Sequence, residues 1–422
     1  MIERSTDPSQ ARASARPARD PVAVTGLGLV TPAGIGTKAS WDGVLSGVSA
    51  AATDPNLAGI SSDISCKVPG FDAAAMLGRK AARRVDRFVQ LAMAAAQEAV
   101  ADSGLDPETW DGARVGVVIG CGMGGAATWE EQHRRLIELG PDRVSAMLIP
   151  MLVPNMVAGQ LAMDVRAYGP NLVTATACAS GATAIGTARD LLLSGACDVV
   201  ISGGTEAGVT RLSVAGFAQM GALSGRTDDP AHASRPFDVA RDGFVPAEAA
   251  GILILERSED ARARGARVYG HVAGYGASAD AHHITAPDPS GHGAELAMRS
   301  ALADAGVDPG DVDHVNAHGT STPLNDVAEA RTLRRVLGDR ALVSSTKGVT
   351  GHSLGAAGAI EAGFSLLALR DGVVPPTANL ESLDPEVQID VVAKAPREAS
   401  LEVVMSDSFG FGGQNAVLVL TR

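Results

Sequence analysis

Cysteine, aromatic residues and long apolar runs are all scarce in this sequence. Only 4 of its 422 residues are cysteine, and 3% are aromatic. The cysteines form no CxxC pair and no regular framework, so we expect reduced thiols and a cytoplasmic protein rather than a disulfide-bonded secreted one. No apolar run approaches the length of about 18 residues needed to span a bilayer, so no membrane association is expected.

Positive charge is also in deficit. Lys and Arg number 35 against 48 Asp and Glu, which gives a net charge of −13. Binding to phosphates needs a basic footprint, so nucleic acid is not expected as a partner. Residues 1–20 are polar and lack the apolar segment of a secretory signal, so we expect a disordered N-terminal tail.

Small residues are abundant, and strands alternate with helices along the chain. There are 49 glycines, and 45% of residues are hydrophobic, which predicts a large, closely packed core. The order of strands and helices in 21–265 resembles that in 266–422, so we expect a duplicated α/β fold. Lys80–Ser103 is predicted to be one long helix with a basic start. Val327–Leu337 is predicted to be a shorter helix, and Gly221–Val245 a long functional or interfacial loop.

The stretch Val173–Gly186 (VTATACASGATAIG) is the strongest candidate for a reactive site. A short strand meets a helix through a small-residue turn, which places Cys178 at a helix N-terminus. Amide hydrogens and the helix dipole there would stabilise a thiolate, which favours a nucleophile. A buried structural cysteine is the alternative at this stage.

A glycine-rich turn follows the apolar strand Arg114–Gly120. Residues 120–125 (GCGMGG) satisfy the GxGxxG pattern, but no acidic residue ends a strand about 20 residues later. We therefore do not predict a dinucleotide site. The glycines instead favour close approach of the backbone to a ligand or a neighbouring element.

Three further motifs place polar groups at strand ends in the C-terminal part. They are NAHGTSTP around His318, STKGVTGH with Lys347 and His352, and SFGFGGQN around Phe411. Each histidine alone is more often an ordinary surface or core residue than a functional one. Together with Cys178 they predict a Cys–His–His site.

These motifs resemble those of β-ketoacyl-acyl-carrier-protein synthases, the elongating condensing enzymes with a thiolase-like fold, and synthase II in particular. TACASGA, NAHGTSTP, STKGVTGH, GAAGAIEA and SFGFGGQN occur in the family order, and the resemblance covers residues 21–422. It implies duplicated βαβαβαββ halves that form a layered αβαβα body. It also implies fatty-acid or polyketide elongation, with the phosphopantetheine carried by an acyl carrier protein and with no free cofactor or metal.

The resemblance assigns roles to individual residues. Cys178 would carry the acyl chain, and the backbone amides of Cys178 and Phe411 would hold the oxyanion. His318 and His352 would stabilise the enolate left by decarboxylation of a malonyl thioester. Lys347 would support the site electrostatically, and Glu361 would anchor the helix behind it.

The same resemblance suggests binding residues. Thr285, Thr320 and Thr322 are candidates for pantetheine contacts, and Phe411 for a gate. Met123 would line the far end of the acyl pocket, or else be ordinary core. A basic group would dock an acidic carrier, or else be a solvated face: Arg79, Lys80, Arg83, Arg84, Arg87 and Arg226.

Related activities are distinguished by what the chain contains. No cysteine follows Cys197, which argues against a thiolase, and the nucleophile argues against an inactive chain-length factor. A dimer is expected, either of identical chains or with a ketosynthase-like partner in a type II polyketide or polyene synthase. A non-catalytic acyl-binding subunit is the alternative from another class.

Some positions depart from the family pattern. Pro246, Ala247 and Ala249 stand in a segment that is usually glycine-rich, so we expect a changed local path or partner-facing surface there. Asp407 replaces a common asparagine and is expected to add negative charge near the gate turn.

Overall fold

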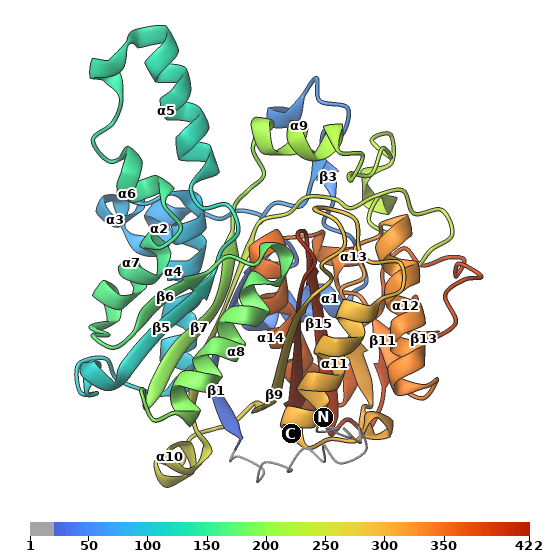
Figure 1. Ribbon diagram of the computed structural model, residues 1–422. Helices are drawn as coiled ribbons and strands as arrows, with labels where there is room; N and C mark the ends of the chain where they lie inside the picture. Colours follow the sequence, from blue (N-terminus) through green and yellow to red (C-terminus); the bar gives the residue numbers. More distant parts are fainter. Residues whose placement is uncertain (1–20) are drawn as a thin grey trace, which may run out of the picture.

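The computed structural model describes residues 21–422, and the expected N-terminal tail lies outside this range. A twelve-stranded sheet dominates the structure (Figure 1). The first half of the chain supplies β1 (Val22–Thr31), β5 (Val115–Gly120), β6 (Asn171–Thr174), β7 (Val199–Glu206) and β8 (Ala249–Arg257). The second supplies β9 (Gly270–Ala279), β10 (His314–Asn316), β11 (Leu342–Ser344), β15 (Val403–Gly410) and β16 (Gln414–Thr421).

The two halves have the same topology. Strands lie in the order β6-β5-β7-β8-β1 in one half and β11-β10-β15-β16-β9 in the other. In both, the first three are parallel and the last two are added antiparallel. A short antiparallel pairing of β1 with β9 joins the halves. The prediction of a duplicated α/β fold is therefore confirmed.

Helices form three layers around these strands. α8 (Ser180–Leu193) and α14 (Ala357–Asp371) pack against each other and against strands of both halves, so they make the middle layer. α4 (Arg87–Ser103) and α7 (Met156–Val165) cover one outer face, and α11 (His292–Ala305) covers the other, beside α12 (Pro323–Leu337). The result is the expected αβαβα layering.

The middle layer explains the abundance of small residues. α14 is buried along almost its whole length, so it has no polar face. A Cβ on Gly181 of α8 would lie 2.7 Å from the backbone nitrogen of Ala359, and one on Gly358 of α14 would lie 2.8 Å from that of Ala182. Glycine at these positions lets the two helices meet near their N-termini.

The predicted helix Lys80–Ser103 is wrong as one element. α3 (Arg79–Ala82) ends, and α4 begins only at Arg87. Asp86 has extended backbone angles and its carboxylate accepts a hydrogen bond from the amide of Phe88, so it caps a new helix. α12 begins four residues before its predicted start, at Pro323, which is favoured in a first helical turn.

The longest of the remaining helices and strands, α5 (Ala126–Leu139), projects from the body (Figure 1). The long stretch Gly221–Val245 contains only one 3₁₀ turn, as expected. No helix within 21–422 is long and apolar enough to cross a membrane. The other helices are α1 (Thr37–Leu45), α2 (Ala73–Leu77), α6 (Leu148–Leu152), α9 (Arg211–Gln219), α10 (Ser258–Ala263) and α13 (Lys347–Thr350). The other strands are β2 (Gly34–Ile35), β3 (Ala52–Thr53), β4 (Ile64–Ser65), β12 (Val373–Val374), β13 (Asp390–Val391) and β14 (Arg397–Glu398).

Candidate active site

Cys178 lies in a strained turn between β6 and α8. The preceding residue, Ala177, has a φ of 49°, which is unusual for a residue with a side chain. The hydroxyl of Ser180 donates to the carbonyl of Ala177 at 2.6 Å and accepts from the amide of Thr176 at 3.0 Å. These bonds hold the turn that presents the sulfur at the start of the helix, as the sequence predicted. The sequence alone did not indicate the role of Ser180.

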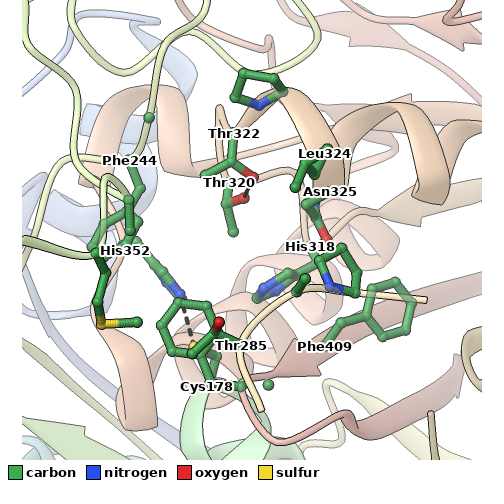
Figure 2. Close-up of a pocket in the computed structure, with 18 of the residues that line it drawn as sticks. Cys178, Phe244, Thr285, His318, Thr320, Thr322, Leu324, Asn325, His352 and Phe409 are labelled. Carbon is green, nitrogen blue, oxygen red and sulfur yellow. Dashed lines mark hydrogen bonds between the residues drawn. The ribbon is translucent and has the colours of Figure 1, made fainter. Parts of the chain in front are cut away.

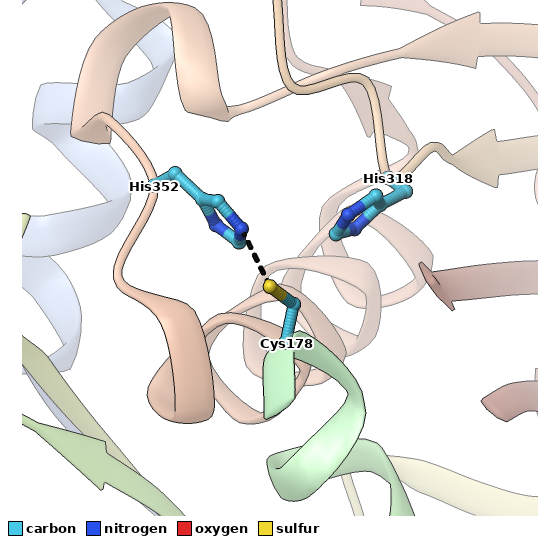
Figure 3. A group of neighbouring side chains, drawn as sticks. All are labelled: Cys178, His318 and His352. Atoms are coloured by element: carbon cyan, nitrogen blue, oxygen red, sulfur yellow. Dashed lines mark hydrogen bonds between the residues drawn. The ribbon is translucent and has the colours of Figure 1, made fainter. Parts of the chain in front are cut away.

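The structure brings the three predicted reactive side chains together (Figure 3). The Sγ of Cys178 lies 3.1 Å from the Nε2 of His352. The ring of His318 meets the ring of His352 edge-on, with 5.3 Å between their centroids. All three side chains are buried, and their ligating atoms lie within 4.8 Å of one another, so this group could also hold a metal ion.

Burial and the charge of Lys347 together favour neutral histidines in this site. Lys347 is only 1% exposed, and its ammonium pairs with the equally buried carboxylate of Glu361. Burial and the positive charge of Lys347 hold the pKa of both His318 and His352 well below the usual value, with a smaller contribution to His318 from His352. Both imidazoles are therefore neutral at pH 7, and each carries one N–H that can be donated to a developing oxyanion.

Burial opposes the thiolate that the sequence predicts at Cys178. Burial raises the pKa of its thiol to about 11, although the backbone N–H groups of Phe411 and Cys178 and the charge of Lys347 act in the opposite direction. Desolvation outweighs the helix terminus because the side chain is almost completely enclosed. The same two N–H groups approach the sulfur of Cys178.

Glu329 supports the loop that carries His318, and sequence reasoning missed it. Its carboxylate accepts from the amides of His318 at 2.6 Å and Gly319 at 2.7 Å. Burial raises its pKa to about 7. The available signal was an acidic residue on the buried face of a predicted helix, beside Ala330 and Leu333.

The triad opens into a cavity of about 360 Å³ (Figure 2). Thr285, Thr320 and Thr322 line it, and the hydroxyls of the last two are 2.9 Å apart. Phe411 also lines it, on a turn where Gly412 and Gly413 have φ of 83° and 70°. Met123 does not line this cavity; it packs against the apolar cluster that contains Cys178.

The glycine-rich turn after β5 binds a carboxylate of the protein itself. Glu206 is fully buried and accepts from the amides of Gly122 at 2.8 Å, Met123 at 3.2 Å and Gly355 at 3.2 Å. Burial raises its pKa to about 7. Glu206 thus ties this turn to the segment after His352, a link that no local pattern indicated.

Pro246, Ala247 and Ala249 are all buried, so their side chains do not form a partner-facing surface. The alternative of a changed local backbone path stays a prediction. The amide of Ala247 donates to the carbonyl of His352 at 3.0 Å, and the amide of His352 donates to the carbonyl of Val245 at 2.8 Å. This segment therefore supports a site residue from inside the molecule.

The surroundings of Asp407 disfavour the negative charge that the sequence predicts there. Asp407 is fully buried, and neither carboxylate oxygen has a hydrogen-bond partner among residues 21–422. Burial, with the neighbouring carboxylates of Glu329 and Glu361, raises its pKa well above the usual value and so favours the protonated form.

The basic residues proposed for docking differ in their surroundings. Four are exposed and make no ion pair with any residue of the described chain: Arg79, Lys80, Arg83 and Arg84. Arg87 is paired with Glu248. Arg226, far along the chain, is half-buried and donates to the carbonyl of Ala240.

Comparisons with known proteins agree with this architecture. The N-terminal domain of beta-ketoacyl synthases matches residues 19–261, and the C-terminal domain matches 269–381. A 3-oxoacyl-[acyl-carrier-protein] synthase 2 of Synechocystis sp. is 47% identical over 95% of this chain and 98% of its own. One from Staphylococcus aureus is 45% identical over 95% of this chain and 98% of its own.

Solved structures show the same similarity. A beta-ketoacyl synthase from Burkholderia phymatum has a TM-score of 0.89 at 33% identity, covering 96% of this chain and 99% of its own. The ketosynthase of a type II polyketide system, solved with its acyl-carrier protein, has a TM-score of 0.89 at 32% identity and the same coverage. The matched models span most of the sequence, and this chain belongs to the beta-ketoacyl synthase family of condensing acyltransferases.

Proposed function

We propose that this enzyme elongates carrier-bound acyl chains by decarboxylative condensation with malonyl-carrier protein, in fatty-acid synthesis. The observation that carries the proposal is the contact between Cys178 Sγ and His352 Nε2, with His318 beside it, at the end of a cavity. The relatives with 45% and 47% identity are named as synthase 2 enzymes, which supports the fatty-acid pathway.

In the first step, Cys178 attacks the thioester of an acyl carrier protein. A C–S bond forms at Cys178, the bond to the pantetheine sulfur breaks, and the proton of the Cys178 thiol ends on the released pantetheine thiol. The backbone N–H groups of Cys178 and Phe411 would hold the oxyanion between these events.

In the second step, a malonyl thioester loses carbon dioxide, and the electron pair of the broken C–C bond remains as an enolate. Neutral His318 and His352 would each donate a hydrogen bond to the enolate oxygen. The enolate carbon attacks the acyl carbonyl and forms the new C–C bond. Cys178 leaves as a thiolate and takes up a proton. Lys347 and Glu361 would support this step by keeping the histidines neutral and in place.

Other residues would bind the substrate and its carrier. Thr285, Thr320 and Thr322 line the route to Cys178 and offer hydroxyls to the pantetheine amides. Phe411 would gate this route, and Met123 would limit the acyl end. The exposed basic residues near α3, with Arg226, would dock the acidic carrier; no further cofactor is proposed.

We propose that the protein is a cytoplasmic homodimer. Within each chain, we place the boundary between the two thiolase-like halves between residues 265 and 266. A second candidate is the catalytic subunit of a type II polyketide synthase, because similar structures include ketosynthases solved with chain-length factors. Copurification of a homologue that lacks the nucleophile would favour this second candidate.

The proposal is tested by the intact mass of the protein after incubation with a series of acyl-carrier proteins. A covalent acyl increment on the wild type, absent from Cys178→Ala, is expected, and its size reports the preferred chain length. An unreactive Cys178 would favour a non-catalytic acyl-binding subunit instead.

A further inference from the structure

Arg87 differs from its basic neighbours in what it contacts. Its Nε and Nη2 donate to the two carboxylate oxygens of Glu248, both at 2.6 Å. Its guanidinium also lies over the ring of Phe71, 5.3 Å from the centroid. The charge of Arg87 is therefore paired with a carboxylate of the protein itself, whereas the exposed Arg83 and Arg84 have no such partner in the described chain.

Glu248 fixes one end of a buried segment. Its side chain is 3% exposed and also accepts from the amide of Val68 at 3.0 Å. Its own amide donates to the carbonyl of Cys66 at 3.2 Å, and the amide of Cys66 donates to the carbonyl of Pro246 at 2.9 Å. The backbone from Pro246 to Glu248 is thus held by hydrogen bonds to Cys66.

The same segment holds His352. Ala247 and Val245 bond to the carbonyl and amide of His352, at 3.0 and 2.8 Å. The ring of Phe244 meets the imidazole of His352 edge-on, 5.3 Å between centroids. One residue, Ala247, separates Glu248 from Pro246, whose backbone bridges to His352.

We infer that the Arg87–Glu248 ion pair is a positioning element for His352, and that it joins the basic surface around α3 to the condensation step. The inference rests on the proposed function for the roles of that surface and of His352. Without Arg87, a buried carboxylate would lose its charged partner, and the segment from 244 to 248 would shift to rehydrate it. Small displacements of a reacting group reduce rate strongly, even when their cause is distant.

The test uses malonyl-CoA, a thioester with the same pantetheine arm and no carrier protein. We expect Arg87→Ala to lower kcat for decarboxylation of malonyl-CoA by about tenfold, with KM within about twofold of the wild type. Arg87→Lys, which keeps one charged bond to Glu248, should recover most of that loss. Glu248→Gln, which keeps the acceptor for Val68, should show a loss of the same kind.

Arg84→Ala is the matched control, because Arg84 is exposed and unpaired in the described chain. It should raise KM for malonyl-carrier protein and leave the malonyl-CoA reaction unchanged. Alkylation of Cys178 by iodoacetamide should slow in Arg87→Ala, since Cys178 Sγ contacts the Nε2 of His352 at 3.1 Å, and should keep the wild-type rate in Arg84→Ala.

Two results would overturn the inference. In one, Arg87→Ala behaves like Arg84→Ala and affects only the carrier-bound substrate, so that Arg87 is a docking residue. In the other, Arg87→Lys recovers none of the decarboxylation lost in Arg87→Ala, so that the charged bond to Glu248 is not what positions His352. A wild type inactive towards both malonyl-CoA and malonyl-carrier protein would overturn the proposed function itself, and the inference with it.

Discussion

The turns that precede the two middle-layer helices have nearly the same backbone and different chemistry. Each begins with a non-glycine residue of positive φ, Ala177 at 49° before α8 and Leu354 at 48° before α14. The next residue is Cys178 in the first turn and Gly355 in the second. A Cβ on Gly355 would lie 2.6 Å from the amide nitrogen of Gly122 and 2.7 Å from the carboxylate of Glu206.

In this duplicated fold, the two equivalent turns differ in which side chains they can accommodate. The first turn has room for a nucleophilic side chain, whereas the second is filled by Glu206 and the glycine-rich turn. The second half instead contributes polar side chains around the first turn: His318, His352, Lys347 and Glu361. The proposed site is therefore shared: Cys178 comes from one half, and the two histidines and Lys347 come from the other.

The largest expected effect is loss of the nucleophile. Cys178→Ala should abolish acyl transfer and lower condensation by at least about 1,000-fold, because no other described side chain can carry the acyl group there. Malonyl decarboxylation should persist, since the groups proposed for it lie in the other half. Intact mass and release of carbon dioxide measure the two steps separately. Loss of both would contradict the division of roles.

The converse substitutions remove the enolate-stabilising groups. His318→Ala and His352→Ala should each lower decarboxylation by roughly 100- to 1,000-fold, as expected for a lost oxyanion donor. Acylation of Cys178 should fall much less in His318→Ala, because the contact with the sulfur is made by His352. Single-turnover acylation measured by mass separates the two variants, and equal loss of acylation in both would argue against separate roles.

A smaller effect is expected when the second turn is made to resemble the first. Gly355→Ala places a methyl group against the backbone of Gly122, so the free energy of unfolding should fall by about 1–3 kcal/mol. Gly159→Ala in α7 is the control, since no atom lies within 4 Å of the added Cβ. There alanine should stabilise the helix by up to about 1 kcal/mol. Urea denaturation measures the unfolding free energy of both variants. Equal values would show that the structure accommodates a methyl group at Gly355 without losing stability.

The contribution of Asp407 to the free energy of unfolding depends on pH. Its pKa is raised in the folded state, so the unfolded chain releases this proton at lower pH, and the contribution of Asp407 to stability falls as pH rises above its usual pKa of 3.8. Asp407→Asn removes this pH-dependent loss of stability. The unfolding free energy of the variant, relative to the wild type, should rise by up to about 1.4 kcal/mol per pH unit between pH 3.8 and the raised pKa, and should change little with pH below pH 4. Unfolding free energies at several pH values provide the test, and a constant difference would contradict it.

Much of the site was predictable because its signals are local. A strand, a small-residue turn and a helix placed Cys178 at a helix start, and His318 and His352 were each predicted at a strand-to-helix turn. The break between α3 and α4 was missed, although Asp86 is a good capping residue, because the apolar periodicity continues across it. Glu329 and Glu206 were missed because their partners lie in other segments of the chain.

The sequence by itself determined the family and the duplicated fold and predicted the reactive residues, since these follow from motifs and from element order within short stretches. Only the tertiary structure decided the protonation states and the supporting contacts. The pKa values of Cys178 and Asp407 are raised because burial disfavours the charged form, and burial depends on how distant segments pack. Arg87 was grouped with its neighbours by sequence, yet its side chain is committed to Glu248, which is 161 residues away along the chain.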